Sequence, residues 1–332
     1  MIHPIPSGTR DVLPDEMREL RAITRALLEV YEDEGYGELW TPTLEYEEVL
    51  RRASGAAEPA YRVFDDHGEV LALRSDMTVP IARVVASRYP TAEPPLRFCY
   101  TAHAYRAVGR HRGQTREFLQ SGVELVGASA PEGTAEALRV MCRALDATGL
   151  RDYRIAVGDA SLYPALLRGF ELSEEATSRL MSELVSRDFV GLEREARALG
   201  LSAADTELLM GVPQLRGGPS VLDAVGGPGA EAVAGLRRVL ELLDASVADR
   251  IIFDLGLSRG LGYYTGAVFD VLDPSLGTPL GGGGRYDDLL GRFGRPLPAV
   301  GFALAVDQLH LALAERDVAR TSPDTATGER NA

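Results

Sequence analysis

Polar side chains at two places in the chain have the types and spacing of a binding pocket. Asp76 and Thr78 stand between an apolar run and a helical pattern, where a carboxylate and a hydroxyl can hold an ammonium group. Alone, this pair fits a helix N-cap better than a ligand site. Gln120 and Glu124 alternate along another run, so both point to one face of a strand. Two polar side chains on one face of a central strand indicate a pocket more than a surface.

Arginines concentrate in and beside one expected loop. The guanidinium group suits phosphate or carboxylate, because its donors form a planar fork. A solvated hairpin tip explains the same pattern about equally well. The four arginines are Arg106, Arg110, Arg112 and Arg116.

Two glycine-rich segments also carry polar or aromatic residues. In 258–266, glycines surround Arg259, Tyr263 and Tyr264, which a turn with aromatic core residues would also explain. Segment 281–290 opens with four glycines and continues Arg-Tyr-Asp-Asp. Glycine runs let a backbone approach a ligand closely, although a lone run is usually a flexible turn.

Periodicity predicts the elements that must position these residues. Strands in runs joined by hairpins predict an α+β fold, with an antiparallel sheet flanked by helices. Alanine, leucine and glutamate dominate 161–248, which predicts a helical insertion into a core of 1–160 and 249–318. The polar tail 319–332 is expected to be disordered. Helices are expected at 15–34, 77–89, 130–147 and 301–316, and strands at 61–74, 96–127, 153–159, 251–254 and 267–271.

The composition is that of a soluble globular protein. Of 332 residues, 45% are hydrophobic and 25% charged, so a sizeable core can be buried. No run approaches the roughly 18 apolar residues that span a bilayer, and the start lacks a secretory signal. Cys99 and Cys142 fit free thiols in a reducing cytosol better than a disulfide. We therefore expect a cytoplasmic protein, and the histidine spacing predicts no metal site.

The charge balance disfavours nucleic-acid binding. The chain has 35 basic and 49 acidic residues, a net charge of −14. Proteins that neutralise many phosphates usually present a basic face, although a local basic patch can exist on an acidic protein.

The order of these segments resembles the catalytic core of histidyl-tRNA synthetases, a class II aminoacyl-tRNA synthetase family. The resemblance begins with Gly-Thr-Arg-Asp-Val-Leu-Pro at 8–14 and runs to about residue 316. The motifs Tyr-Tyr-Thr-Gly and Gly-Gly-Arg-Tyr-Asp are specific to the histidyl branch. The resemblance implies a sheet of about six antiparallel strands, and normally a dimer.

The resemblance also implies a histidine pocket. Asp76, Thr78 and Gln120 would hold the ammonium group, although the family more often has Glu at position 76. Glu124 and Tyr264 would bond the two imidazole nitrogens, and Arg259 would contact the carboxylate. The expected histidine-binding residues are Asp76, Thr78, Gln120, Glu124, Arg259, Tyr263 and Tyr264.

The same resemblance implies a damaged ATP site. Arg106 remains as a vestigial phosphate contact, but Val108 stands where the family carries Glu. Gln114 and Gln308 replace arginines, and glutamine has neither the charge nor the guanidinium plane. Each lost charged contact costs a few kcal/mol, roughly. No cofactor is expected.

After the last helix, no anticodon-binding domain is expected. A synthetase-like core with a histidine pocket, a damaged ATP site and no anticodon-binding domain resembles the regulatory subunits of ATP phosphoribosyltransferase, a paralogous family. The resemblance implies that the chain is not an enzyme and binds neither tRNA nor membrane. It would form a homodimer within a hetero-oligomer with the short-form catalytic subunit, and report the concentration of histidine, its effector. The subunit interface stays open as a second place for the regulatory histidine.

Two enzymatic alternatives remain. One is a ligase that activates histidine for another acceptor, and the other is a truncated histidyl-tRNA synthetase. Both require ATP, so the substitutions at positions 108, 114 and 308 count against them.

Overall fold

A computed structural model describes residues 5–54, 61–107, 115–170, 172–257 and 262–321, with side chains described to residue 316. Within these ranges, nine strands form one sheet in the order β1-β5-β6-β12-β11-β10-β7-β9-β8. The six strands from β5 to β7 in this order are antiparallel throughout, which confirms the predicted sheet. They are β5 (Leu96–Tyr105), β6 (Glu117–Val126), β12 (Ala299–Ala305), β11 (Gly281–Arg285), β10 (Ala267–Leu272) and β7 (Arg154–Asp159).

The outer strands make the whole sheet mixed, which the sequence did not indicate. Strand β1 (Gly37–Glu38) runs parallel to β5, and β9 (Ile251–Asp254) runs parallel to β7. Strand β8 (Arg216–Gly217) pairs with β9 at the far edge. The expected strands at 153–159, 251–254 and 267–271 are confirmed.

Helices α1 (Pro14–Asp33), α4 (Glu132–Ala147) and α11 (Val306–Thr321) pack on one face of the sheet. In α1, buried apolar side chains recur every three or four residues, which places them on one stripe toward the sheet. Pro14 occupies the first turn, where its missing N–H costs nothing. The helices predicted at 15–34 and 130–147 are confirmed.

The opposite face carries a second, smaller core. Helix α3 (Thr78–Arg88), helix α2 (Glu47–Ser54) and the short 3-10 helix η4 (Leu290–Phe293) cover it, with Met77, Phe98 and Tyr286 among the buried side chains. Beside α2 and α3 lies a separate three-stranded sheet of β2 (Leu44–Tyr46), β4 (Val70–Leu73) and β3 (Arg62–Phe64). The helix predicted at 77–89 and the hairpin predicted at 61–74 are confirmed.

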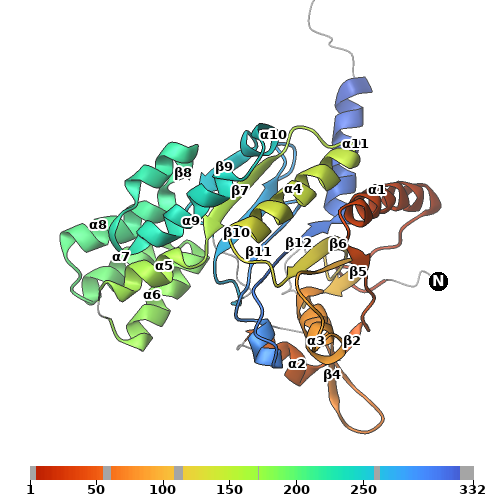
Figure 1. Cartoon of the computed structure of the whole chain (residues 1–332), viewed down its shortest axis with the longest axis horizontal. Coiled ribbons are helices and arrows are strands. Elements are labelled where there is room, and N and C mark those ends of the chain that lie inside the picture. The colour runs from red at the N-terminus through yellow and green to blue at the C-terminus, as the bar shows by residue number, and fades with distance from the viewer. Residues whose placement is uncertain (1–4, 55–60, 108–114, 171, 258–261, 322–332) are drawn as a thin grey trace, which may run out of the picture.

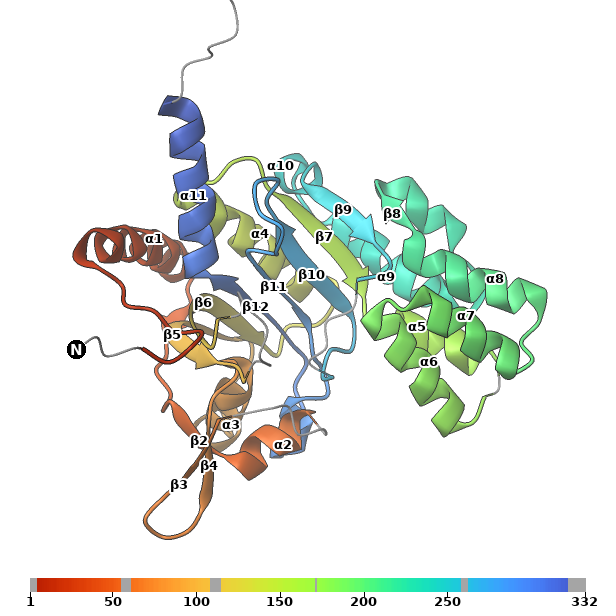
Figure 2. The same cartoon turned by 180° about the vertical axis from the view of Figure 1, so that it is seen from behind.

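Segment 161–248 forms helices, with β8 as a short strand among them. These helices gather at the β9 side of the sheet, opposite α1 and α11 (Figures 1 and 2). Hydroxyl and carboxylate oxygens of Ser173, Asp188 and Ser202 cap three of them by accepting a backbone N–H. The domain boundaries themselves stay a prediction. The helices are α5 (Leu162–Arg168), α6 (Glu174–Ser186), α7 (Phe189–Ala198), α8 (Ala203–Gly211), α9 (Ala230–Glu241) and α10 (Ala245–Ala248), with the 3-10 turns η1 (Val212–Gln214), η2 (Pro219–Ala224) and η3 (Gly227–Gly229).

The prediction of one helix over 301–316 is wrong in its first part. Residues 299–305 form the central strand β12, and the helix begins at Val306. A short apolar run has no period that separates a fully buried strand from a buried helix. Helix α11 reaches Thr321, and most of the predicted disordered tail lies outside the described residues.

The glycine run at 281–284 is also a strand, not a turn. Strand β11 lies between β10 and β12, and a Cβ at Gly283 would be 1.9 Å from the carbonyl oxygen of Gly301. Gly283 therefore lets β11 approach the neighbouring strand β12 closely, and not a ligand.

Three features bear on the expected location and chemistry. Cys99 and Cys142 are buried free thiols. No helix among the described residues has the length and apolarity to cross a membrane. In the same ranges, no three His, Cys, Asp or Glu side chains are grouped to hold a metal ion.

Candidate functional site

A fully buried carboxyl group, that of Glu124, lies at the centre of the site. It is 1% exposed and stands on β6, opposite Gly301 of β12. A Cβ at Gly301 would lie 1.9 Å from Oε2 of Glu124, so a glycine leaves the space that the carboxyl fills. Thr78 Oγ1 donates to Oε1 at 2.6 Å, and the hydroxyl of Tyr286 donates to Oε2.

The pKa of Glu124 is raised to about 8, chiefly by burial and in smaller part by the charge of the nearby Asp76, while the hydrogen bonds from Thr78 and Tyr286 act in the opposite direction. A carboxyl group with this pKa can either donate or accept a proton near neutral pH. It is therefore suited to a ligand that itself titrates in this range, as imidazole does.

Asp76 stands at the start of α3, next to Thr78. Its Oδ1 accepts the backbone N–H of Val79 at 3.0 Å, and its Oδ2 accepts the Ser75 hydroxyl at 3.2 Å. Burial raises the pKa of Asp76, against the effect of these bonds and of the charge on Arg106. The capping role is thus present, and the carboxyl is also close enough to Glu124 for their charges to interact.

Gln120 lies on the same face of β6 as Glu124, with Gly122 between them. Its carbonyl oxygen Oε1 is buried and has no hydrogen-bond partner among the described residues. An unsatisfied buried acceptor costs about 1–3 kcal/mol. An ammonium or amide donor from a ligand would remove that cost.

Three tyrosine rings form one wall. The ring centroids of Tyr263 and Tyr264 are 4.9 Å apart, and those of Tyr263 and Tyr286 are 5.8 Å apart. Tyr264 lies over Gly284 of β11, since a Cβ at that glycine would be 2.9 Å from the Tyr264 ring. The glycines of β11 therefore leave room for the tyrosine rings to pack directly against the strand.

Tyr286 is the site residue that sequence reasoning missed. Its Gly-Gly-Arg-Tyr-Asp motif was visible, but the motif suggested no role for the tyrosine. The register of β11 against β12 brings Tyr286 to Glu124, and that register cannot be read from a glycine run.

The structure brings together six of the seven expected histidine-binding residues, from Asp76 to Tyr264. The seventh, Arg259, lies outside the described residues, as do Val108 and Gln114. Arg106 lies beside the site, with its guanidinium 5.1 Å from the centre of the Phe118 ring. The roles assigned to all of them stay predictions.

The two residues at the start of α11 make other contacts. Asp307 accepts Arg10 Nη2 at 2.7 Å and the Leu119 N–H at 3.0 Å, so it joins the N-terminal segment to β6. Gln308 accepts the hydroxyl of Thr278 at 3.3 Å in an exposed position. Gln308 thus takes part in a neutral surface contact.

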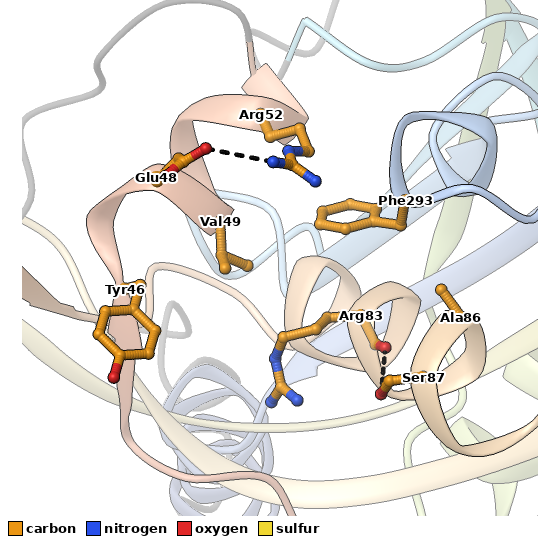
Figure 3. Close-up of a pocket in the computed structure, with 8 residues that line it drawn as sticks. All are labelled: Tyr46, Glu48, Val49, Arg52, Arg83, Ala86, Ser87 and Phe293. Atoms are coloured by element: carbon orange, nitrogen blue, oxygen red, sulfur yellow. Dashed lines mark hydrogen bonds and ion pairs between the residues drawn. The ribbon is translucent and has the colours of Figure 1, made fainter.

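A separate groove of about 360 Å³ lies between α2, α3 and η4 (Figure 3). Its arginines are already paired: Arg52 donates to Glu48 at 3.1 Å, and Arg83 makes a two-pronged contact with Glu45. None of the predicted site residues lines it. The lining consists of Tyr46, Glu48, Val49, Arg52, Arg83, Ala86, Ser87 and Phe293.

Comparison with known proteins gives consistent results. Residues 8–309 match the family model described as histidyl-tRNA synthetase. A relative in Symbiobacterium thermophilum, named ATP phosphoribosyltransferase regulatory subunit, is 41% identical over 96% of this chain and 82% of its own length. A relative of the same name in Desulforamulus reducens is 38% identical over 92% of this chain and 78% of its own.

A solved structure from Bacillus halodurans shares the fold. It is described as an ATP phosphoribosyltransferase regulatory subunit/histidyl-tRNA synthetase, with a TM-score of 0.86 and 35% identity. The match covers 94% of this chain and 84% of that one. These matches extend over the whole sheet and over 161–248.

Proposed function

The chain belongs to the histidyl-tRNA synthetase family, and from this premise we propose that it is a non-catalytic regulatory subunit of ATP phosphoribosyltransferase that binds histidine at Glu124. The names of its relatives support a regulatory role in histidine biosynthesis. The observation that carries the ligand assignment is the buried carboxyl of Glu124, with a pKa of about 8 and two hydroxyl donors.

Imidazole suits this carboxyl group because the two can share one proton. Near neutral pH, either a protonated Glu124 donates to neutral imidazole, or an imidazolium donates to the carboxylate. Thr78 and Tyr286 hold the carboxyl in place, so its orientation is set before the ligand arrives. The orphaned oxygen of Gln120 and the carboxylate of Asp76 would accept the ammonium group.

Feedback inhibition by histidine would follow if histidine binding is coupled to a change between an active and an inhibited state of the complex. Histidine inhibits only if it binds the inhibited arrangement more tightly than the active one. The partner would be the short-form catalytic subunit, joined to a homodimer of this chain in a hetero-oligomer. The words "regulatory subunit" in the relatives' names support such a partner.

Absence of ATP chemistry is part of the proposal. Gln308 cannot stack and pair as an arginine would, and its side chain bonds Thr278 at the surface. Histidine-dependent exchange of pyrophosphate into ATP should therefore be negligible. Exchange at a rate typical of a synthetase would instead favour a histidine-activating ligase.

The first test is reconstitution. The chain is mixed with a short-form catalytic subunit, and phosphoribosyl-ATP formation is measured with and without histidine. Activity that appears only in the mixture and falls with histidine supports the proposal. An unchanged catalytic activity, with pyrophosphate exchange by this chain alone, would show that it is an enzyme.

A Glu124→Ala variant distinguishes the two places where histidine could act. If histidine binds at Glu124, inhibition weakens at least tenfold while assembly is retained. Unchanged inhibition in the assembled variant would place the regulatory histidine elsewhere. Glu48→Ala, on the exposed surface of α2, serves as the matched control.

A further inference from the structure

The chain turns at the end of strand β9 through residues 254–257, which we call the β9 turn. Its first residue, Asp254, is buried, and its Oδ1 accepts the backbone N–H of Gly256 at 3.0 Å. The backbone N–H of Leu257 donates to the carbonyl oxygen of Asp254, also at 3.0 Å. On one side the turn contacts the helical segment 161–248, which gathers at this edge of the sheet (Figures 1 and 2), and on the other it contacts the aromatic wall of the candidate site.

The helical segment supplies most of the hydrogen bonds that hold the middle of the β9 turn. Leu255 donates its backbone N–H to the carbonyl oxygen of Leu215 at 3.0 Å, and its own carbonyl oxygen accepts the hydroxyl of Tyr163 at 2.5 Å. The carbonyl oxygen of Gly256 accepts Nη2 of Arg187 at 3.1 Å. Three of the four backbone polar groups of Leu255 and Gly256 are therefore bonded to the helical segment. Since an unpaired buried backbone group is costly, the turn must follow this segment when it moves.

Close packing strengthens this attachment. A Cβ at Gly256 would be 2.2 Å from the carbonyl oxygen of Pro213 in η1, so only glycine fits there. Two arginines of the helical segment also flank the carboxylate of Asp254, with Nη2 of Arg187 at 3.6 Å and Nε of Arg216 at 3.8 Å from Oδ2. Both arginine side chains are about half exposed, so these ion pairs add little by themselves. The backbone contacts set the position of the turn, and the charges assist.

Arg187 has an unusual backbone conformation for its residue type. It ends helix α6 with φ 56° and ψ 30°, and among the described residues it is the one residue other than glycine with a positive φ. Its backbone N–H caps the helix by donating to the carbonyl oxygen of Leu184 at 3.2 Å. Glycine adopts this cap conformation without strain, whereas other residues hold it only where their surroundings compensate. The contact of the guanidinium with the β9 turn is such a compensation, and glycine could not make it.

The last residue of the β9 turn faces the aromatic wall. Leu257 packs in a small buried cluster with Ala156 of β7 and Val268 of β10, and Tyr264 packs against the same cluster. A Cβ at Gly158 of β7 would be 3.1 Å from the Cβ of Leu257, so the leucine lies directly on the strand. Because close-packed side chains transmit displacements, a shift of the turn would move Tyr264.

We propose that Arg187 is a positioning residue of the histidine pocket. Through the β9 turn and Leu257 it fixes the place of Tyr264, and the helical segment thereby responds to occupancy of the pocket. This role rests on the proposed function, because Tyr264 is an expected histidine-binding residue. By linkage, a segment whose placement favours histidine binding is itself held more firmly once histidine is bound.

The positioning role is tested with Arg187→Gly, which removes the guanidinium and keeps the helix cap, because glycine accepts a φ of 56°. The variant should fold, as thermal unfolding will show, and its histidine affinity in titration calorimetry should fall about tenfold. The matched control is Arg194→Ala on the neighbouring helix α7, whose side chain pairs with Glu183 at 3.9 Å within the helical segment. Its affinity should equal that of the wild type. Wild-type affinity in folded Arg187→Gly overturns the positioning role.

Tyr163→Phe provides a second variant that keeps the ring and removes only the hydroxyl bonded to Leu255. Its histidine affinity should fall in the same direction, about threefold. If Arg187→Gly does not fold, this variant decides, and an unchanged affinity in Tyr163→Phe then overturns the proposal.

A double variant separates positioning of Tyr264 from a general loss of structure. Tyr264→Phe removes the hydroxyl that would bond the imidazole. If Arg187 acts by placing that hydroxyl, adding Arg187→Gly to Tyr264→Phe should lower histidine affinity by less than threefold, instead of tenfold. Fully additive losses would show that Arg187 does not act through Tyr264.

The response of the helical segment is measured by hydrogen exchange. Histidine should slow exchange of the peptide 183–191, at the corner between α6 and α7, at least threefold in the wild type and not in Arg187→Gly. Exchange in α1 serves as an internal control. Equal exchange of 183–191 with and without bound histidine overturns the response. A wild type that binds no histidine would contradict the proposed function and this role together, whereas a wild type that binds it no better than Arg187→Gly contradicts this role alone.

Discussion

The carboxyl group of Glu124 occupies the space that a side chain at Gly301 would take. A Cβ at position 301 would lie 1.9 Å from Oε2 of Glu124, across the β6–β12 pair. The orientation of the central acid thus depends on a glycine 177 positions later in the chain (301 minus 124).

Gly301→Ala should therefore displace the Glu124 carboxyl from its donors. We expect histidine affinity to fall at least tenfold, about 1.4 kcal/mol, and overpacking to destabilise the fold by about 1–3 kcal/mol. Calorimetric titration with histidine and thermal unfolding measure the two effects. Gly235→Ala is the control, since its Cβ meets only the end of a flexible arginine, 4.0 Å away, in helix α9. Wild-type affinity in Gly301→Ala would contradict this account of the pocket.

Tyr286→Phe removes one hydroxyl donor while keeping the ring in the aromatic wall. That hydrogen bond lowers the pKa of Glu124, so its loss should raise this pKa above its value of about 8 in the wild type. We expect histidine binding to weaken by about 1 kcal/mol, the usual value of one hydrogen bond. Tyr105→Phe, whose hydroxyl bonds the exposed Glu117, is the control. Equal losses in both variants would show that Tyr286 has no special part.

Histidine binding should have a pH optimum. The proposed complex requires one proton shared between Glu124, with a pKa of about 8, and an imidazole with an ordinary pKa of about 6.5. Above pH 8 both groups lose their protons, and below about 6.5 both carry one, so affinity should fall on each side. Titration calorimetry from pH 5.5 to 9 measures this profile. In Glu124→Gln the fall above pH 8 should disappear, and a fall that persists would assign it to another group.

The stability of the ligand-free protein should also depend on pH through the raised pKa of Glu124. Its pKa is raised from 4.5 to about 8 on folding, so the folded state binds more protons than the unfolded state between these values. This contribution to stability is complete below pH 4.5 and is lost as pH rises toward 8. The free energy of unfolding of Glu124→Gln, relative to wild type, should therefore increase by roughly 3–4 kcal/mol between pH 5 and 8. Denaturant unfolding at both pH values measures it, and Glu48→Gln should show no such change.

Much of the fold could be predicted because its amphipathic elements show clear periods. In α1 the apolar residues from Leu20 to Tyr31 recur at helical spacing, and the hairpin of β3 and β4 is marked by a polar turn. The central strands β11 and β12 were missed for the opposite reason. They are covered on both faces and built of glycine, alanine and other apolar residues, so no alternation marks them.

The residues of the site could also be predicted only where the sequence shows a period. Gln120 and Glu124 could be paired because both lie on one strand with a visible period of two. Tyr286 could not be assigned, because its position follows from the pairing of β11 with β12. Contacts across strands depend on register, and a run of glycines carries no register information.

In the proposed histidine pocket, the orphaned oxygen of Gln120 would select among ligands. Imidazole compounds without an α-amine could still reach Glu124, yet they would leave this buried acceptor empty. Sites built around a polar group of the ligand reject analogues that lack it far more strongly than sites that only match shape. Metabolites that share the imidazole ring of histidine would then pass unnoticed, and only the finished amino acid would be sensed.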